Sequence, residues 1–310
     1  MVIIILLGLY LPQDVDGKRI KIREGQGLMS IAETLDQEGI IKNKYLFVSY
    51  AMLLRKDKSL QAGTYLFSGR LTTPTVLYII ASGLAESEDV IVRIPEGFNI
   101  WEMDERLYQS GLSERGQFAD KYYKDEGKFF PDTYRFQRDF SIGEIAGRMQ
   151  KAQENEIAEL LEGLSSEKVK EIIIMASMLE KEARQEIDMR RVAGVIRRRL
   201  RIGMALEIDA TVAYGACLRD FVRSDPPKNC AVQQVNLIKE IPTDSLYNTY
   251  ARKNLPVGPI ANPGLKSIKA ALNPLDEGYL FYLSTRDGSR MIFSKTGAEH
   301  VRNRKMYLGI

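Results

Sequence analysis

Two segments of the chain share one pattern of apolar and polar positions, offset by 72 residues. They span 22–40 and 94–112, and each runs from an apolar stretch through a Glu-Gly pair to apolar residues at helical spacing. Gly39 and Gly111 follow, where a helix C-cap requires a left-handed residue. We predict two similar strand–turn–helix units, the first inside a small module at 12–86. The matched apolar positions are Leu28 with Ile100, Ile31 with Met103 and Leu35 with Leu107.

The remaining pattern divides the chain at the polar stretch 85–89, the best candidate for a linker. Before it, 45–54 and 73–80 have helical spacing and 62–67 is predicted as a strand. Helices dominate the later part of the pattern. We therefore predict an α+β fold, in which the small module precedes a larger mixed α/β domain with a helical core at 87–310. Further short strands are predicted at 211–214, 279–284 and 290–294.

The first eleven residues are apolar and uncharged, and Pro12 and a polar stretch follow them. As a helix this run would reach roughly 16 Å, about half the hydrocarbon core of a bilayer, so it does not span one by itself. It also lacks the basic flank and small-residue cleavage site of a signal peptide. We interpret residues 1–11 as part of a single-pass membrane anchor. The alternative is a first core strand.

Composition excludes several classes of function. The 310 residues are 45% hydrophobic and 27% charged, as in ordinary globular proteins, and a net charge of +3 is too small for a dedicated nucleic-acid binder. The arginine-rich run 197–201 falls on the polar face of a predicted helix and is interpreted as a solvated surface. Cys217, Cys230 and His300 are too few for a Cys/His metal site, and we expect neither metal nor cofactor. A Cys-His catalytic pair is arithmetically possible, but neither cysteine lies in a nucleophile motif.

The strongest candidate for chemistry lies at the end of a predicted helix. Its interior is apolar through 172–179 and ends abruptly in Glu180 and Glu182. At about 100° per residue, Glu180 falls on the face of Ile173 and Ser177, whereas Glu182 lies roughly 160° around the helix. A carboxyl group beside an apolar wall has a raised pKa, which suits a general acid at neutral pH. The alternative is a solvated helix end that carries two surface acids.

Five segments together resemble the YceG-like endolytic murein transglycosylases (the MltG family). The helix end, Ala176-Ser-Met-Leu-Glu-Lys-Glu182, is similar to the family's Ala-Ser-x-x-Glu-Lys-Glu signature, and the resemblance extends over 20–310. Glu207 stands where the family usually has Gln, and we expect an extra carboxylate there to raise the pKa of Glu180. The other four segments, in the family's order, are Glu126-Gly-Lys-Phe-Phe-Pro-Asp-Thr-Tyr134, 199–215, 244–264 and Phe293-Ser-Lys-Thr-Gly-Ala-Glu-His300.

The resemblance implies an activity and an organisation. The family's essential acid matches Glu180. The implied reaction is endolytic cleavage of peptidoglycan glycan strands between MurNAc and GlcNAc, which forms 1,6-anhydro-MurNAc ends and terminates nascent strands. The resemblance also implies a lysin-motif-like module at 12–86, and a catalytic domain held on the extracytoplasmic side of the cell membrane. Peptidoglycan synthases are candidate partners.

One carboxyl group is enough for this reaction, because the sugar's own 6-hydroxyl can replace the positioned water or second carboxyl of an ordinary glycosidase. Polar side chains must then orient the sugars. The alternative roles are turns for the threonines and Asn248, the core for Tyr247, and a mere connection for the loop 256–264. The candidate substrate-binding residues are Glu207, Asp209, Thr211, Tyr247, Asn248, Thr249, Asn262, Ser294, Lys295, Glu299 and, supporting them, His300.

Two other functions stay open at this point. A hydrolytic muramidase would take its second carboxylate from Glu182, Glu207 or Asp209, and it would leave a reducing end instead of an anhydro end. A non-catalytic peptidoglycan-binding scaffold could be built on the repeat. If the chain acts outside the membrane, Cys217 and Cys230 lie in an oxidising space and are expected to pair.

Overall fold

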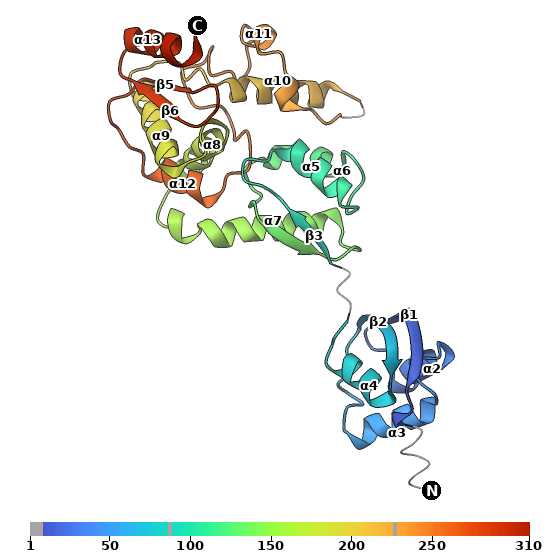
Figure 1. Ribbon diagram of the computed structural model, residues 1–310. Helices are drawn as coiled ribbons and strands as arrows, with labels where there is room; N and C mark the ends of the chain where they lie inside the picture. Colours follow the sequence, from blue (N-terminus) through green and yellow to red (C-terminus); the bar gives the residue numbers. More distant parts are fainter. Residues whose placement is uncertain (1–8, 86–88, 226–227) are drawn as a thin grey trace. The chain divides into compact units, whose positions relative to one another are not determined.

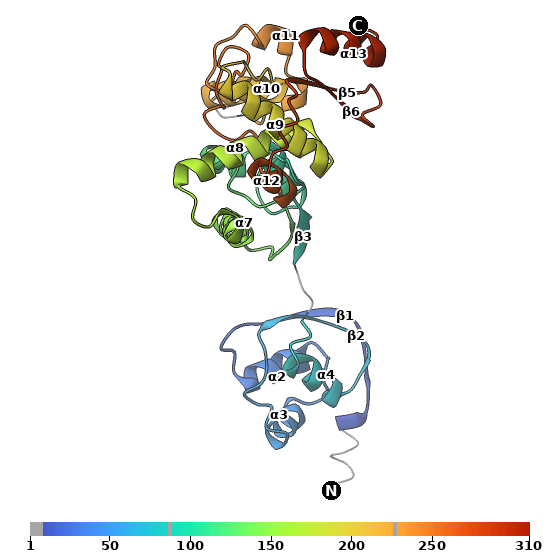
Figure 2. The same ribbon diagram turned by 90° about the vertical axis from the view of Figure 1, so that its left-hand side faces the viewer.

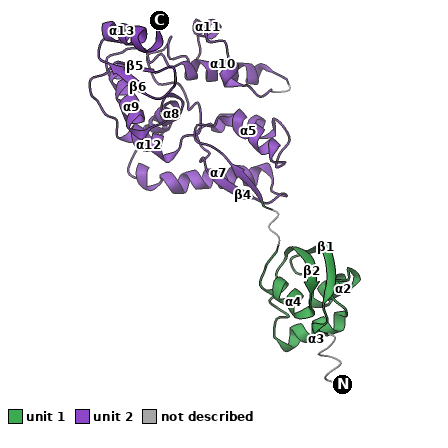
Figure 3. Ribbon diagram, viewed as in Figure 1, with its two compact units in different colours: residues 1–89 green, residues 90–310 purple. Residues whose placement is uncertain are grey.

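The chain forms two compact units, residues 1–89 and residues 90–310 (Figures 1 and 3). The computed structural model describes residues 9–85, 89–225 and 228–310. Each unit has a hydrophobic core of its own. Phe47, Tyr65 and Phe67 are buried in the first core, and Trp101 and Phe118 in the second. The mixture of helices with small antiparallel sheets confirms the predicted α+β class.

The first unit is built on a two-stranded antiparallel sheet of β1 (Gln13–Ile22) and β2 (Gly63–Leu71). Ile20 of β1 pairs with Tyr65 of β2, and both side chains are buried. Three helices complete the unit, and their apolar side chains pack with those of the sheet in one hydrophobic core. Whether the unit is a lysin-motif module stays a prediction. The helices are α2 (Leu28–Gln37), α3 (Lys44–Leu53) and α4 (Thr73–Ala81).

The expected membrane anchor at 1–11 lies mostly outside the described residues, which begin at Leu9. The alternative reading of this run as a first core strand also falls there, and the first described strand begins at Gln13. Within the part of the chain that the structure describes, no helix has the length and apolar character needed to cross a bilayer.

The second unit begins with a sheet and helices that flank it. β3 (Val90–Arg93) pairs antiparallel with β4 (Thr133–Phe136). Between the two strands lie α5 (Ile100–Gln109) and α6 (Gln117–Tyr122), and α7 (Ile142–Ile157) follows. This part of the fold therefore brings 126–136 beside the second copy of the repeat. Two single 3-10 turns, Tyr123–Asp125 and Glu159–Leu161, complete it.

A cluster of helices forms the centre of the second unit. The long helix α8 (Ser166–Glu182) packs against α9 (Glu186–Arg201) and α12 (Leu265–Leu272), which lie beside it in both views (Figures 1 and 2). Gly194 of α9 is needed there, because a Cβ would collide with the carbonyl group of Leu275. The remaining elements are α10 (Asp209–Arg223), Val232–Gln234, α11 (Leu237–Glu240), β5 (Phe281–Ser284), β6 (Met291–Ser294) and α13 (Gly297–Leu308).

One predicted strand is wrong, because 211–214 lies inside α10. The β-branched Thr211 and Val212 and the nearby Gly215 disfavour a helix by propensity. Tertiary packing overrides that preference, since all three residues are buried in the core of the second unit. The strands predicted near 279–284 and 290–294 are found as β5 and β6.

The predicted repeat is confirmed at the level of secondary structure. α2 and α5 have the same bounds at the offset of 72 residues, and each follows an antiparallel strand. Gly25 and Gly97 of the two Glu-Gly turns have φ of 75° and 77°. Gly39 and Gly111 end the helices with φ of 67° and 70°, in the left-handed region that favours glycine. The same turn chemistry therefore shapes both copies.

The predicted disulfide between Cys217 and Cys230 is also confirmed. It joins α10 to the segment that follows it, with a Cα–Cα distance of 5.5 Å. That separation lies in the usual range for bridged cysteines.

Candidate active site

Glu180 lies in the last turn of α8, where a loop from the far end of the chain passes over it. Its Oε1 accepts a hydrogen bond from the Gly264 amide at 2.9 Å. One turn earlier on the same helix face, the Ser177 hydroxyl oxygen accepts from the Ile260 amide at 3.1 Å. The loop 260–264 therefore runs along the face of α8 that carries Ser177 and Glu180.

The surroundings of Glu180 favour its protonated form. Burial raises the pKa of its carboxyl group, and the like charge of Glu96 raises it further. The hydroxyl group of Ser267 and the hydrogen bond from the Gly264 amide oppose this shift, as does the ammonium group of Lys181. The pKa is raised on balance, so a larger fraction of the carboxyl group is protonated near neutral pH, as a general acid requires.

Asn262 holds the loop in place, and its side chain is fully buried. Its amide nitrogen Nδ2 donates to Glu126 Oε1 at 2.7 Å, and its Oδ1 accepts from the Phe129 amide at 3.0 Å. Its backbone exchanges hydrogen bonds with the turn at Gly97 and Phe98. The predicted substrate-binding residue Asn262 thus positions the loop that contacts Glu180.

Glu126 is the buried carboxyl group at the centre of this support. Its Oε2 accepts from the Ile100 amide at 2.9 Å, at the start of α5. Burial raises the pKa of Glu126 to about 7, although the hydrogen bond from Ile100 opposes the shift. The group links the beginning of α5, the family-like segment at 126–134 and the loop at Asn262.

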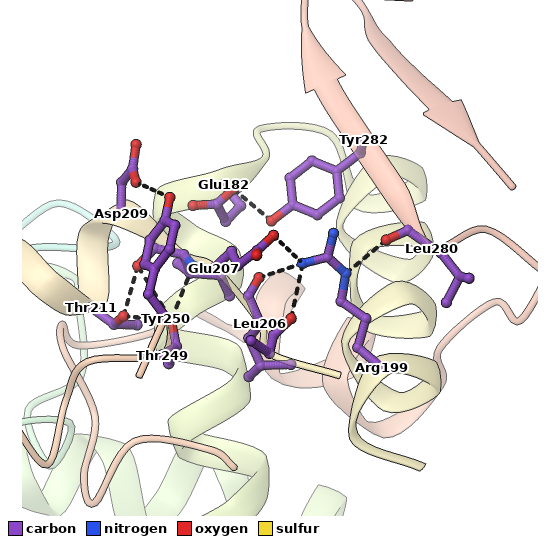
Figure 4. Close-up of polar contacts among 12 residues, drawn as sticks. Glu182, Arg199, Leu206, Glu207, Asp209, Thr211, Thr249, Tyr250, Leu280 and Tyr282 are labelled. Carbon is purple, nitrogen blue, oxygen red and sulfur yellow. Dashed lines mark hydrogen bonds and ion pairs between the residues drawn. The ribbon is translucent and has the colours of Figure 1, made fainter. Parts of the chain in front are cut away.

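Glu182 belongs to a separate polar cluster (Figure 4). It accepts a hydrogen bond from the Tyr282 hydroxyl at 2.7 Å, and the Tyr250 hydroxyl donates to Asp209 at 2.6 Å. Burial, and then the charge of Asp209, raise the pKa of Glu182, against the hydrogen bond from Tyr282. Helical geometry thus sends Glu180 and Glu182 to different partners, as the 100° rule predicts.

Arg199 organises the other side of this cluster, and its guanidinium is buried. It donates to the carbonyl oxygens of Leu280 at 2.7 Å and Leu206 at 2.8 Å, and it lies 3.5 Å from Glu207 (Figure 4). Glu207 is exposed and has φ of 54°, a left-handed conformation that is uncommon for a residue with a side chain. Its charge therefore faces Arg199, and it is not among the groups that shift the pKa of Glu180.

Three predicted binding residues brace the backbone around this cluster. The hydroxyl groups of Thr211 and Thr249 lie 2.9 Å apart, and the Ile208 amide donates to the Thr249 hydroxyl at 3.0 Å. Asn248 donates to the carbonyl oxygens of Ile241 and Thr243 at 2.8 and 2.7 Å. All three side chains are buried, which fits their alternative role of supporting turns. Tyr247 is half-buried, with its ring 5.1 Å from that of Tyr214.

The last predicted segment surrounds β6 and the start of α13. Ser294 is buried and accepts from Asn303, while Glu299 accepts from the backbone amide of Lys295 at 2.8 Å. His300 stacks on Phe281 with ring centroids 5.2 Å apart. Burial lowers the pKa of His300, as do two neighbouring arginines, against the charge of Glu207. His300 therefore packs against the Arg199 cluster, and Lys295 is exposed beside it.

Two of the larger cavities lie along other parts of the same elements. A cavity of about 800 Å³ is lined by α8, α9 and the segment 254–257. Another of about 540 Å³ is lined by Glu126, Gln153 and Tyr247 among others. Glu180 lines neither cavity, so the candidate substrate-binding residues stay a prediction. No group of three or more residues able to hold a metal ion is found among the described residues.

Sequence reasoning missed three residues that surround Glu180. Glu96, Gly264 and Ser267 lie far from it in sequence and near it in the fold. One available signal was the repeat, because Glu96 occupies the Glu-Gly turn of the second copy. Another was the Pro-Gly pair that ends the loop just before α12.

Comparisons with known proteins agree on one family. The profile of the YceG-like family matches residues 20–306. An endolytic murein transglycosylase of Bacillus subtilis (strain 168) is 28% identical over 331 aligned residues, covering 96% of this chain and 87% of the relative. One from Streptococcus pneumoniae serotype 2 is 23% identical, and this chain spans only 60% of its length. A crystal structure of a yceG-like protein from Listeria monocytogenes has a TM-score of 0.55 and 26% identity, covering 93% of this chain and 99% of that one.

Proposed function

The chain belongs to the YceG-like family, and on that premise we propose that it is a lytic transglycosylase that cleaves peptidoglycan glycan strands. The bond cut lies between MurNAc and GlcNAc within the strand, so cleavage terminates nascent strands. The observation that carries the proposal is the position of Glu180. It is the half-buried acid at the end of α8, held by the Gly264 amide, with a raised pKa.

The proposed reaction needs one carboxyl group in two roles. Protonated Glu180 donates its proton to the glycosidic oxygen, and the bond from that oxygen to the anomeric carbon of MurNAc breaks. The 6-hydroxyl of the same MurNAc then attacks the anomeric carbon, and the Glu180 carboxylate accepts the hydroxyl proton. The products are a 1,6-anhydro-MurNAc end and a GlcNAc with a free 4-hydroxyl. No water is consumed, and Glu180 returns to its protonated state.

The hydrolytic alternative finds less support in the geometry. Its three candidate second carboxylates are already engaged by other side chains. Glu182 accepts from Tyr282, Asp209 accepts from Tyr250, and Glu207 faces Arg199. A non-catalytic scaffold would give no reason for a half-buried acid that accepts a hydrogen bond from a loop amide at the end of α8.

A matched pair of variants tests the assignment. Glu180→Gln keeps the size of the side chain but not its proton, so cleavage should fall by roughly 100-fold or more while folding survives. Glu182→Gln keeps an acceptor for Tyr282 and should cost far less. Mass spectrometry of products from purified glycan strands measures both the rate and the chemistry, since anhydro ends mark the lytic reaction.

Each contrary outcome has a distinct meaning. If Glu182→Gln were inactive and Glu180→Gln active, the catalytic role would be assigned to Glu182. Reducing ends in place of anhydro ends would establish a hydrolase. Full activity in both variants would rule out this site altogether.

We also propose that the second unit works on the extracytoplasmic side of the membrane, attached through the N-terminus, where peptidoglycan synthases are candidate partners. The bridge between Cys217 and Cys230 supports an oxidising compartment, since disulfides are rare in the cytosol. Protease added outside intact spheroplasts should degrade residues 90–310. Their protection until the cells are lysed would contradict the proposal.

A further inference from the structure

The Glu-Gly turn of the second repeat copy lies against Glu180. Gly97 has φ of 77° and packs on the Glu180 side chain so closely that a Cβ would come within 3.3 Å of the Glu180 Cβ. The Gly97 amide donates to the Asn262 carbonyl oxygen at 2.9 Å, which ties the turn to the loop over the site. The position of the turn beside Glu180 is therefore fixed from two sides.

Glu96, the residue before Gly97, shares a contact residue with Glu180. The Gly264 amide donates to Glu180, and a Cβ on Gly264 would come within 2.7 Å of the Glu96 carboxyl carbon. The carboxyl groups of Glu96 and Glu180 thus both lie next to Gly264. Glu96 is exposed, and within the described part of the chain it has no hydrogen-bond or ion-pair partner.

We propose that Glu96 is a positioning residue of the cleavage site, whose negative charge holds Glu180 in the protonated form that donates to the leaving oxygen. The inference rests on the proposed function and deepens it. It also explains why the side of the site facing Glu96 is built from two glycines. A side chain at Gly264 would displace Glu96, and one at Gly97 would displace Glu180.

The other polar groups near Glu180 favour its ionised form, whereas Glu96 favours its protonated form. From α8 itself, Lys181 favours the ionised form of Glu180, but its ammonium group lies 3.5 Å from Glu102 and is shared with it. The Gly264 amide, just before α12, and the Ser267 hydroxyl in α12 also favour the ionised form. Burial opposes them most strongly by raising the pKa of Glu180, and Glu96 is the anion that raises this pKa further. After the first proton transfer, the same repulsion makes Glu180 a stronger base toward the 6-hydroxyl.

The test compares Glu96→Gln with Glu24→Gln in the full chain. Glu24 occupies the same turn position in the first copy, so its variant controls for loss of a carboxylate from this turn. The Glu180 carboxyl group is titrated by ¹³C NMR, and its signal is assigned by its absence in Glu180→Gln. In Glu96→Gln the titration midpoint should move to lower pH, and the cleavage rate at pH 8 relative to pH 5 should fall by roughly threefold or more. Glu24→Gln should change neither.

A second variant moves Glu96 without removing its charge. Gly264 has φ of −88°, which alanine tolerates, so Gly264→Ala should keep the amide on Glu180 while displacing Glu96. The Glu180 midpoint should then move in the same direction as in Glu96→Gln. An unmoved midpoint in Glu96→Gln, or a uniform loss of rate at every pH, would overturn the inference and leave Glu96 a structural residue. If the wild type cuts no strands, the proposed function falls, while the titration still decides whether Glu96 acts on Glu180.

Discussion

At the scale of single residues, Gly25 and Gly97 offer a matched comparison. Both have φ near 76°, so alanine at either position costs about 1 kcal/mol or more of backbone strain. At Gly25 a Cβ would meet no heavy atom within 4 Å, whereas at Gly97 it would press on Glu180. We expect Gly97→Ala to reduce cleavage by roughly 10-fold or more and Gly25→Ala to leave it unchanged. Thermal unfolding and product analysis measure the two effects separately.

Equal losses of stability in the two variants, with unequal losses of activity, would support this argument. If Gly25→Ala lost as much activity as Gly97→Ala, strain in the repeat would explain both. The contact between Gly97 and Glu180 would then have no special part in cleavage.

Single residues also mark how far the sequence could predict the site. The rotation of 100° per residue placed Glu180 with Ser177 and away from Glu182, and the structure has this arrangement. The proposed role of Glu96 could not be predicted, because its closeness to Gly264 and its electrostatic effect on Glu180 depend on three distant parts of the chain. Thr211 and Asn248 are polar by type but buried in fact, which only their tertiary partners determine.

At the scale of elements, Glu126 joins the start of α5 to the loop that covers Glu180. Its pKa is about 7 in the folded chain against 4.5 when unperturbed, so the folded state holds a proton that the unfolded state has lost between these values. The contribution of Glu126 to the free energy of unfolding should therefore be greatest below pH 4.5 and fall by up to about 3 kcal/mol as the pH rises to 7.

The glutamine variant isolates this contribution. Glu126→Gln is neutral at every pH, so the fall in stability between pH 4.5 and 7 should become shallower. Urea unfolding at several pH values measures it, with Glu162→Gln at an exposed position of the same unit as the control. An unchanged slope in Glu126→Gln would mean that Glu126 is not the group that titrates.

Elements were predicted well where local chemistry decides them. In each repeat copy one glycine lies in the turn before the helix and another follows the end of the helix. The bounds of the two helices agree at the offset of 72 residues. The segment 211–214 was mispredicted because β-branched residues carry a strand signal, while burial in the helical core decides in favour of α10. Local propensity is a weak guide where tertiary packing supplies most of the free energy.

At the scale of the whole molecule, the two units have cores that share no residue. The polar stretch 85–89 marks the division in the sequence, and the boundary between the two units falls after Asp89.

This division predicts that residues 90–310 fold and cleave without the first unit. Every group that contacts Glu180 or shifts its pKa belongs to the second unit, including Glu96, Gly97 and Gly264. The fragment begins at β3, so the second repeat copy stays intact. We expect a single cooperative thermal transition and a kcat on short glycan strands within a few-fold of the full chain's. A folded fragment without activity would show that the first unit completes the site, whereas a raised KM with an unchanged kcat would assign that unit to substrate binding.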